Sequence, residues 1–176
     1  MDRYSFLTWT TYGTWLPGDK RGFVSNVRDG PGPEVRRNIP GTPYDADRPG
    51  LRNSAHAALK CPPIYLLQEQ AQLLLGQFQE TARYRGWHLL AVAIMANHIH
   101  IVVGVAGDPD PSDLLGDFKA YGSRELTRKW SKPGSGTWWT ESGSRRKLPD
   151  EAAIRAVIQY VRDQANPLLV WVADGF

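Results

Sequence analysis

The segment NHIHIVV, residues 97–103, holds two histidines among apolar residues. Residues two apart in a β-strand point to the same face of a sheet, so the imidazoles of His98 and His100 would project side by side. Ile99 would point the other way, into the core. Two adjacent neutral imidazoles suit a divalent metal ion, with one ring nitrogen from each. The alternative, two polar residues on a sheet surface without a ligand, stays open on these residues alone.

A tyrosine and a glutamine near the end of the chain have helical spacing. Tyr160 and Gln164 are four residues apart in IQYVRDQ, so on a helix they would share one face. The tyrosine hydroxyl has a pKa of about 10 and is a weak nucleophile unless a cation polarises the phosphodiester that it attacks. The glutamine oxygen, one turn on, could complete a metal shell. The competing interpretation of Tyr160 is an aromatic residue that packs on the sheet.

Both features occur with further segments: FKAYGSR at 118–124, WWT at 138–140 before Gly143, IQYVRDQ at 158–164, and Asn166-Pro167. Together with the strand that carries His98 and His100, they resemble the HUH single-tyrosine transposases. That family includes insertion-sequence transposases and the transposases associated with repeated extragenic palindromes (REP). The resemblance covers roughly residues 1–16 and 64–170, and the excursion at 17–63 is longer than in the smallest relatives.

The resemblance implies a DNA transposase with nuclease and strand-transferase activity. By position, His98, His100 and Gln164 would bind a divalent metal, Mg²⁺ or Mn²⁺, and Tyr160 would be the nucleophile. The tyrosine would cleave single-stranded DNA, stay attached to the 5′ side and release a free 3′-OH. Rejoining would reverse this step without ATP. The family also implies a homodimer that acts on single-stranded DNA with hairpin structure.

Basic residues in the second half of the chain are candidates for contacts with a DNA backbone. The candidate DNA-binding residues are Lys119, Arg124, Arg128, Lys129, Arg145 and Arg146. For each of them an ordinary solvated charge is the alternative. Tyr121 is a second candidate nucleophile, but it lies on the apolar stripe of its predicted helix and has no glutamine one turn on.

Regular elements must hold these residues in place. Residues 4–16 alternate aromatic and β-branched residues and predict a strand. Residues 17–63 carry most of the prolines and predict a long irregular excursion. Apolar residues at helical spacing predict a helix over 63–84 that ends at Gly86. Residues 87–95 and 97–105 predict two buried strands joined as a hairpin.

The rest of the chain completes a small α+β pattern. We expect a helix from Ser112, as its N-cap, to about Trp130, and a strand that begins at 137–140 and can continue to Leu148. Asp150 would cap a last helix that runs to about Gln164. The order β-α-β-β-α-β-α predicts a ferredoxin-like (RRM-like) antiparallel sheet with helices packed on one face. We expect one transposase-like domain over residues 1–176, with 17–63 as an excursion within it.

Composition excludes several classes of protein. The 176 residues are 41% hydrophobic, enough for a sizeable core. Nothing approaches the roughly eighteen apolar residues of a membrane span, and the N-terminus lacks the core of a signal peptide, so we expect a cytoplasmic location. One cysteine, Cys61, excludes an intramolecular disulfide and a multi-cysteine zinc site. The net charge of +3 is compatible with a polyanionic partner but decides nothing alone.

Three other functions stay open on the sequence. The chain could be a domesticated protein that binds DNA hairpins without cleaving them, an RNA-binding module, or a metal phosphodiesterase whose nucleophile is water. The joint presence of His98, His100, Tyr160 and Gln164 favours the transposase, because a pure binder does not need all four. RNA-binding sheets display aromatic residues where this chain has the two histidines.

Overall fold

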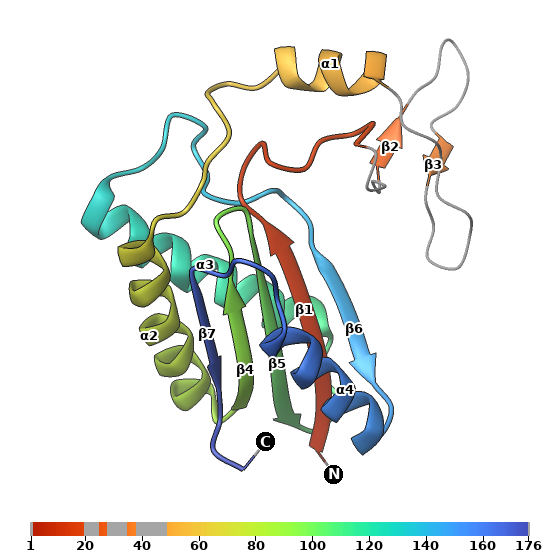
Figure 1. The fold of residues 1–176 in the computed structure, drawn as a ribbon, viewed down its shortest axis with the longest axis vertical. Coiled ribbons are helices and arrows are strands. Elements are labelled where there is room, and N and C mark those ends of the chain that lie inside the picture. Colours follow the sequence, from red (N-terminus) through yellow and green to blue (C-terminus); the bar gives the residue numbers. More distant parts are fainter. Residues whose placement is uncertain (1, 20–24, 28–34, 38–48, 176) are drawn as a thin grey trace.

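The computed structural model describes residues 2–19, 25–27, 35–37 and 49–175 (Figure 1). Its main sheet has five strands in the order β6-β1-β5-β4-β7, and β2 and β3 form a separate antiparallel pair. The elements, in chain order, are β1 (Asp2–Thr10), β2 (Ser25–Val27), β3 (Val35–Arg37), α1 (Pro49–Ala57), α2 (Gln68–Arg85), β4 (His88–Ile94), β5 (His98–Ala106), α3 (Pro111–Trp130), β6 (Ser144–Leu148), α4 (Glu151–Arg162) and β7 (Leu169–Val172).

The main sheet confirms the predicted α+β, ferredoxin-like class. Its strand pairs are antiparallel throughout. Leaving β7 aside, β1, β4, β5 and β6 follow the β-α-β-β-α-β order, with α2 and α3 as the two crossovers. The predicted hairpin of β4 and β5 is present, and the amide of Met95 donates to the carbonyl of His98 across its turn.

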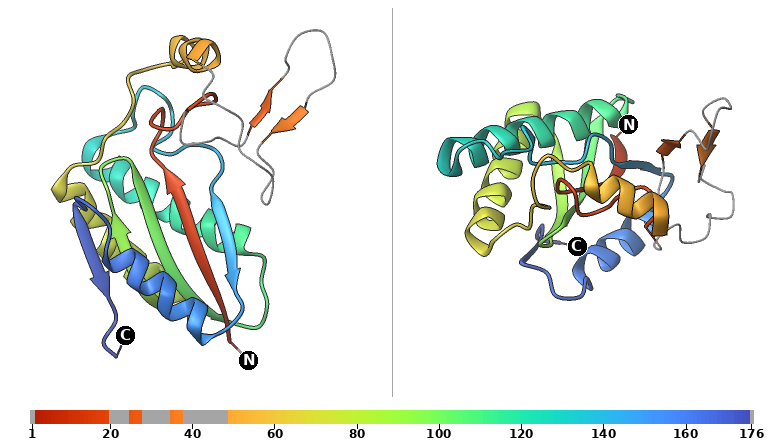
Figure 2. Two further views of the ribbon diagram at one scale, coloured as in Figure 1. Left: turned by 45° about the vertical axis from the view of Figure 1, so that its right-hand side comes forward. Right: turned by 90° about the horizontal axis from the view of Figure 1, so that it is seen from above.

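Helices cover both faces of the sheet, whereas the sequence predicted helices on one face. The buried side chains of α2 and α3 pack against Leu7, Ile99 and their neighbours, while those of α4 pack against Val102 and Ala93 on the opposite face. Figures 1 and 2 show α4 across the sheet from α2 and α3. The last helix of the chain carries its own apolar stripe, so it needs a sheet face of its own.

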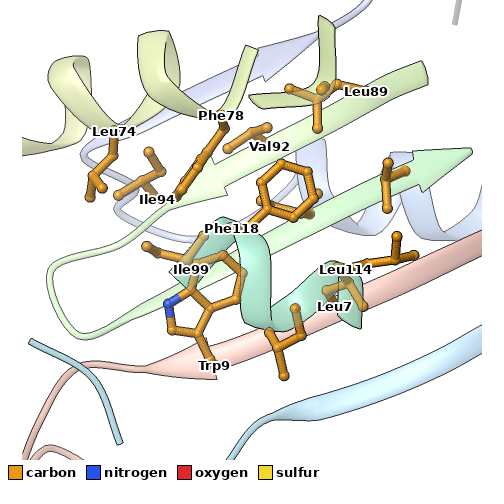
Figure 3. Close-up of a cluster of buried hydrophobic side chains, with 14 of the residues drawn as sticks. Leu7, Trp9, Leu74, Phe78, Leu89, Val92, Ile94, Ile99, Leu114 and Phe118 are labelled. Atoms are coloured by element: carbon orange, nitrogen blue, oxygen red, sulfur yellow. The ribbon is translucent and has the colours of Figure 1, made fainter. Parts of the chain in front are cut away.

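The larger core lies between the sheet and the pair α2 and α3 (Figure 3). Aromatic rings from three elements meet there edge to face: Trp9 with Phe78 at 5.7 Å between ring centroids, and Phe78 with Phe118 at 5.6 Å. Gly122 lets the two helices approach closely, because a Cβ at that position would lie 3.0 Å from a methyl carbon of Leu74.

The first strand and the first long helix are shorter than predicted. β1 ends at Thr10 rather than at residue 16, because Thr14 turns back and donates from its hydroxyl and its amide to the carbonyl of Thr11. α2 begins at Gln68 rather than at Pro63, since the amide of Leu66 donates to the carbonyl of Ala96 instead of joining a helix. Its end is as predicted, with Gly86 in the left-handed conformation.

Three boundaries in the second half also differ from the prediction. Asp110, not Ser112, caps α3, and its carboxylate accepts from the amide of Ser112. Residues 137–140 make one isolated bridge, Trp139 to Thr11, and the strand proper is β6, from Ser144. Asp150 caps α4 as predicted, with its carboxylate accepting from the amide of Ala153, but the helix ends at Arg162 rather than at Gln164.

Two further segments were not predicted as regular elements. β7 pairs with β4 and extends the sheet beyond the ferredoxin-like core. Residues 17–63 were predicted to be irregular, yet their described parts hold β2, β3 and the nine-residue helix α1. The sequence of α1 offers Pro49 for the first turn and then alanines, which favour a helix. Residues 20–24, 28–34 and 38–48 lie outside the described part of the chain.

The register of the sheet is well defined around β5. β5 runs beside β1 without interruption from the pair Asp2 and Ala106 to the pair Thr10 and His98. Beside β4 the register shifts once, between Leu89 and Ala91, as a β-bulge does. No helix in the described part of the chain is long and apolar enough to cross a membrane.

Candidate active site

The two histidines of β5 lie on the sheet face that α4 covers. His98 is opposite Thr10 of β1, and His100 is opposite Thr8. Their rings are 4.8 Å apart between centroids at an interplanar angle of 82°. Ile99, between them, is fully buried on the other face. The predicted side-by-side projection of the histidines is therefore present.

His100 is buried, although the sequence placed it on an exposed face. The residue is 5% exposed, because the Phe6 ring stacks on it at 5.3 Å and the Tyr160 ring lies edge-on at 5.5 Å. Burial, and secondly the charge of His98, lowers the pKa of His100 from 6.5 to about 3. The imidazole is thus held neutral, the form that can bind a metal.

The ring nitrogens of His100 have different surroundings. Nδ1 lies 2.7 Å from the hydroxyl oxygen of Thr8. Nε2 is buried and has no hydrogen-bond partner, one of two such side-chain atoms in the described part of the chain. A buried ring nitrogen without a hydrogen-bond partner suits a cation in the tautomer that leaves its lone pair free, so this residue fits a metal ligand.

Tyr160 reaches His100 from α4. Ile154, Val157, Ile158 and Val161 bury the inner stripe of the helix against the sheet. Tyr160 stands beside this stripe, in the last turn, and is 52% exposed. Its ring lies edge-on to His100 and, at 6.0 Å, to Phe6. A phenol that is open to solvent on one side and next to a buried imidazole on the other is accessible to a large substrate.

Gln164 lies beyond the helix, not on it. Asp163 ends α4, and Asn166 at φ 53° followed by Pro167 turns the chain away. The side chain still returns to the last turn of α4, because its Nε2 donates to the carbonyl of Tyr160 at 3.0 Å. The side-chain oxygen is not used in that bond and is a candidate ligand.

The donor set at this site is small. The described residues include no group of three or more histidine, cysteine, aspartate or glutamate side chains that could hold a metal ion. A metal at the two imidazoles would therefore take its other ligands from a different class of donor. The amide oxygen of Gln164 and the oxygens of a substrate phosphate are of that class.

A family model described as "Transposase IS200 like" matches residues 65–164, more than half of the chain. The chain belongs to this transposase family. The matched range begins before α2 and ends at Gln164, so it includes both histidines and Tyr160. A comparison with curated proteins gives no match.

Two solved structures are similar to this transposase-family chain. One, from Deinococcus radiodurans R1, is described as a candidate transposase, with 15% identity, a TM-score of 0.51, and coverage of 94% of this chain and 93% of that one. The other is a REP-associated tyrosine transposase bound to a REP hairpin, with 14% identity, a TM-score of 0.49 and coverage of 90% of this chain. This chain covers 63% of that longer protein. At these identities the likeness to the first concerns the fold alone.

The six basic candidates do not form one surface in this transposase. Arg146, on β6, is directly opposite Phe6 on the face of the histidines, and its guanidinium lies 5.6 Å from the Phe6 ring centroid. Arg145 alternates to the other face, opposite Leu7. Arg124, Arg128 and Lys129 are on α3, which also covers that other face. Only Arg146 of the six adjoins the ring that stacks on His100.

Lys119 is occupied by the protein itself. Its ammonium donates to the carbonyls of Thr140, Glu141 and Ser142 at 2.6, 2.9 and 3.2 Å, which uses all three of its hydrogens. Burial lowers its pKa from 10.5 to about 8. In this conformation Lys119 holds the loop before β6, and a phosphate contact would require it to give up one of these bonds.

The remaining α3 candidates have local partners of their own. Arg128 forms an ion pair with Glu125 at 2.6 Å, and the ammonium of Lys129 lies over the Trp130 ring. Arg124 lies over the ring of Tyr121, 5.0 Å from its centroid. Tyr121, the second candidate nucleophile, is thus on the helix that covers the opposite face from His98 and His100.

The histidines have three further neighbours that were not predicted from the sequence. These are Phe6 and Thr8 of β1, and Asn97 in the turn before β5. Asn97 adjoins His98 in the sequence, and its side-chain oxygen lies 2.7 Å from Nδ1 of that histidine. Phe6 and Thr8 both lie more than ninety residues before His100 in the chain, and only the pairing of β1 with β5 brings them to the site.

Proposed function

We propose that this protein cleaves and rejoins single-stranded DNA through a covalent 5′-phosphotyrosine at Tyr160, with a divalent metal held by His98, His100 and Gln164. The observation that carries the proposal is the approach of the Tyr160 ring to His100, whose buried Nε2 has no partner. Membership of the transposase family supports the same reaction class. Mg²⁺ or Mn²⁺ would polarise the scissile phosphate when bound.

The reaction is an exchange of phosphodiester bonds. The hydroxyl oxygen of Tyr160 attacks the phosphorus, the bond from phosphorus to the 3′ oxygen breaks, and the phenolic proton is balanced by the proton that the departing 3′ oxygen acquires. The 5′ side stays on the tyrosine. Attack by a second 3′-OH reverses these steps and frees Tyr160. The number of phosphodiester bonds is conserved, so no nucleotide cofactor is needed.

The protein's own residues supply access and orientation. Tyr160 is half exposed, so an extended single strand can reach it without unfolding of α4. Phe6 packs against both His100 and Tyr160 and limits the freedom of the two rings. Arg146, beside Phe6, is the candidate DNA contact of this face, and its guanidinium suits a phosphate oxygen. A hairpin in the substrate, a homodimer and a cytoplasmic location stay predictions from the family resemblance and the sequence.

The test is a search for the covalent adduct. The protein is incubated with Mn²⁺ or Mg²⁺ and labelled single-stranded DNA from the flanks of its own gene, and the products are separated on a denaturing gel. We expect a labelled band at the mass of protein plus DNA fragment, lost with EDTA and in Tyr160→Phe. Tyr84→Phe is the matched control, because Tyr84 is also an exposed helix tyrosine but lies on α2.

Other outcomes would support other functions. Cleavage that survives Tyr160→Phe without an adduct would indicate a water nucleophile. Tight binding of a hairpin-bearing strand without cleavage would indicate a domesticated hairpin-binding protein of the same fold. An adduct that persists in Tyr160→Phe and is lost in Tyr121→Phe would move the nucleophile to α3.

A further inference from the structure

Each histidine of the site has an oxygen on its Nδ1. In His100 the oxygen is the hydroxyl of Thr8, at 2.7 Å, and in His98 it is the side-chain carbonyl of Asn97, also at 2.7 Å. An amide oxygen only accepts hydrogen bonds, so Nδ1 of His98 is the donor in that pair. The hydroxyl of Thr8 can donate or accept. The surroundings of Nε2, the other ring nitrogen of His100, indicate which of the two arrangements is present.

Nε2 of His100 is buried and has no hydrogen-bond partner. If Nδ1 accepted from Thr8, the ring proton would be on Nε2, as a buried N–H group without a partner. If Nδ1 donates to Thr8, Nε2 carries a lone pair that a cation can take. Metal-binding histidines commonly donate their other ring nitrogen to an oxygen in this way, which sets both the tautomer and the ring orientation.

Both oxygens are themselves held by the fold. Thr8 and His100 are directly opposite each other in the ladder of β1 and β5, so the hydroxyl reaches the ring across the sheet. The backbone carbonyl of Asn97 accepts from the amide of Thr11 at 3.0 Å and from the hydroxyls of Thr11 and Thr14 at 3.2 and 3.1 Å. The loop after β1 therefore fixes the turn that carries Asn97.

We propose that Thr8 and Asn97 are positioning residues that hold His100 and His98 with the proton on Nδ1, so that each histidine presents Nε2 to one shared divalent cation. The proposal rests on the proposed function, because it assumes that the histidines bind a metal. It adds two residues from outside the candidate ligand set and assigns the ligating atom of each imidazole. Neither residue touches the reacting phosphate in this scheme.

The first measurement needs no metal. Long-range ¹⁵N–¹H spectra of the histidine rings distinguish the two tautomers, and we expect His100 and His98 of the wild-type protein to carry the proton on Nδ1. In Thr8→Val, which keeps the shape of the side chain but loses its oxygen, His100 should become a mixture of tautomers. Thr8→Ser should restore the wild-type spectrum. A wild-type His100 with its proton on Nε2 would overturn the proposal.

The second measurement is the affinity for Mn²⁺ alone, from the electron paramagnetic resonance signal of the free ion. Loss of the Nδ1 partner should weaken binding about 10- to 100-fold in Thr8→Val and in Asn97→Leu, as it does at other metal sites. Thr8→Ser and Asn97→Asp keep an oxygen and should bind as wild type or better. Thr10→Val is the matched control, because Thr10 is on the same strand and face but its hydroxyl donates to Thr140.

His100→Ala distinguishes a failure of the proposed metal site from a failure of the positioning role. If this variant binds Mn²⁺ as well as wild type, the metal site of the proposed function is wrong, and the positioning role is wrong with it. If His100→Ala loses binding while Thr8→Val and Asn97→Leu keep it, the metal site stands and the positioning role is overturned. Thermal unfolding of each variant checks that a loss of affinity is not a loss of the fold.

Discussion

Lys119 illustrates how one half-buried charge can organise a loop of this protein. Its ammonium joins the carbonyls of Thr140, Glu141 and Ser142, just before the strand that carries Arg146. The indole of Trp139 in turn donates to the carbonyl of Lys119 at 2.9 Å. The residue thus ties α3 to the loop before β6 through its side chain and through its backbone. Neither contact requires DNA.

Removing this ammonium should destabilise the protein with a characteristic dependence on pH. The pKa of Lys119 falls from 10.5 to about 8 because of burial, with Glu141 raising it and Arg145 lowering it further. Between pH 8 and 10.5 the unfolded chain therefore holds the proton more strongly than the folded one. The stability of wild type relative to Lys119→Met should rise with pH across that window and be independent of pH below it.

Urea unfolding of both proteins at pH 7, 8, 9 and 10 checks this expectation. At pH 7 we expect Lys119→Met to be less stable by about 0.5–1.5 kcal/mol, the net range for an ordinary hydrogen bond, because one of the three bonds is partly buried and the other two are exposed. A wild-type advantage that shrinks above pH 8 would mean that the three carbonyls hold the proton more strongly than burial expels it.

At the scale of elements, α4 brings Tyr160, the proposed nucleophile, to His100, a proposed metal ligand. It has its own apolar cluster on its own sheet face, apart from the core of α2 and α3. Its first turn is fixed by the Asp150 carboxylate, which accepts from the amide of Ala153 at 2.8 Å. Tyr160 is in the last turn, at the other end of the helix. The N-cap of α4 and Tyr160, the proposed nucleophile, thus lie at opposite ends of the helix.

Asp150→Ala should therefore lower stability more than it lowers activity. Loss of an N-cap costs about 1 kcal/mol, and chemical denaturation should report a loss of that size. The yield of the Tyr160 adduct, measured well below the unfolding transition, should stay close to wild type. Asp150→Asn, which keeps a capping oxygen, is the control and should lose much less stability. A strong loss of adduct in folded Asp150→Ala would show that the two ends of α4 are coupled.

Much of this arrangement could be predicted from the sequence. The class of fold could be predicted because its signals are local in the sequence. These signals are the apolar runs around His98 and Ile101 and the helical spacing of apolar residues in α2, α3 and α4. Boundaries failed where side chains bond to nearby backbone, as Thr14 does to Thr11 and Asp110 does to Ser112. β7 was missed because its four residues carry too little pattern of their own before they pair with β4.

The candidate site was predicted to the extent that its residues lie in local motifs. His98 and His100 could be selected because they are two residues apart in one predicted strand. The burial of His100 was not predictable, because its cover comes from Phe6 and Tyr160, at distant positions in the chain. The pairing of Thr8 with His100 depends on strand register, which no single segment encodes. Gln164 was placed on the helix, and it lies beyond the helix end.

Across the whole molecule, the sheet divides the candidate DNA-binding residues between two sides. Arg146 shares a face with His98, His100 and Tyr160, whereas Lys129 and Arg128 belong to α3 on the opposite face. Fields of separate charges fall off within about 10 Å at ordinary ionic strength. Charges on the two sides therefore act on different parts of a bound strand, and only one side adjoins the proposed chemistry.

Arg146→Gln and Lys129→Gln should consequently have different effects. Arg146→Gln should slow adduct formation about 10-fold or more at saturating DNA, since it removes a charged donor beside Phe6, the ring that packs against Tyr160, the proposed nucleophile. Lys129→Gln should leave that rate unchanged and at most weaken DNA binding. The slope of the logarithm of the binding constant against the logarithm of the salt concentration should fall in magnitude by about 1. Single-turnover kinetics and binding titrations at several salt concentrations measure the two effects. Equal rates for both variants would contradict the division by face.

The β-bulge between Leu89 and Ala91 has a consequence for how this chain can change in length. β4 already accommodates one extra residue there, while the ladder of β5 and β1 runs without a gap to His98. Because side chains alternate along a strand, one residue inserted into β5 next to His100 would turn one of the two imidazoles toward the core of α2 and α3. Two inserted residues would restore the face. Insertions and deletions in β5 should therefore be tolerated when they involve an even number of residues. An odd number should be tolerated only where a new β-bulge accommodates the extra residue.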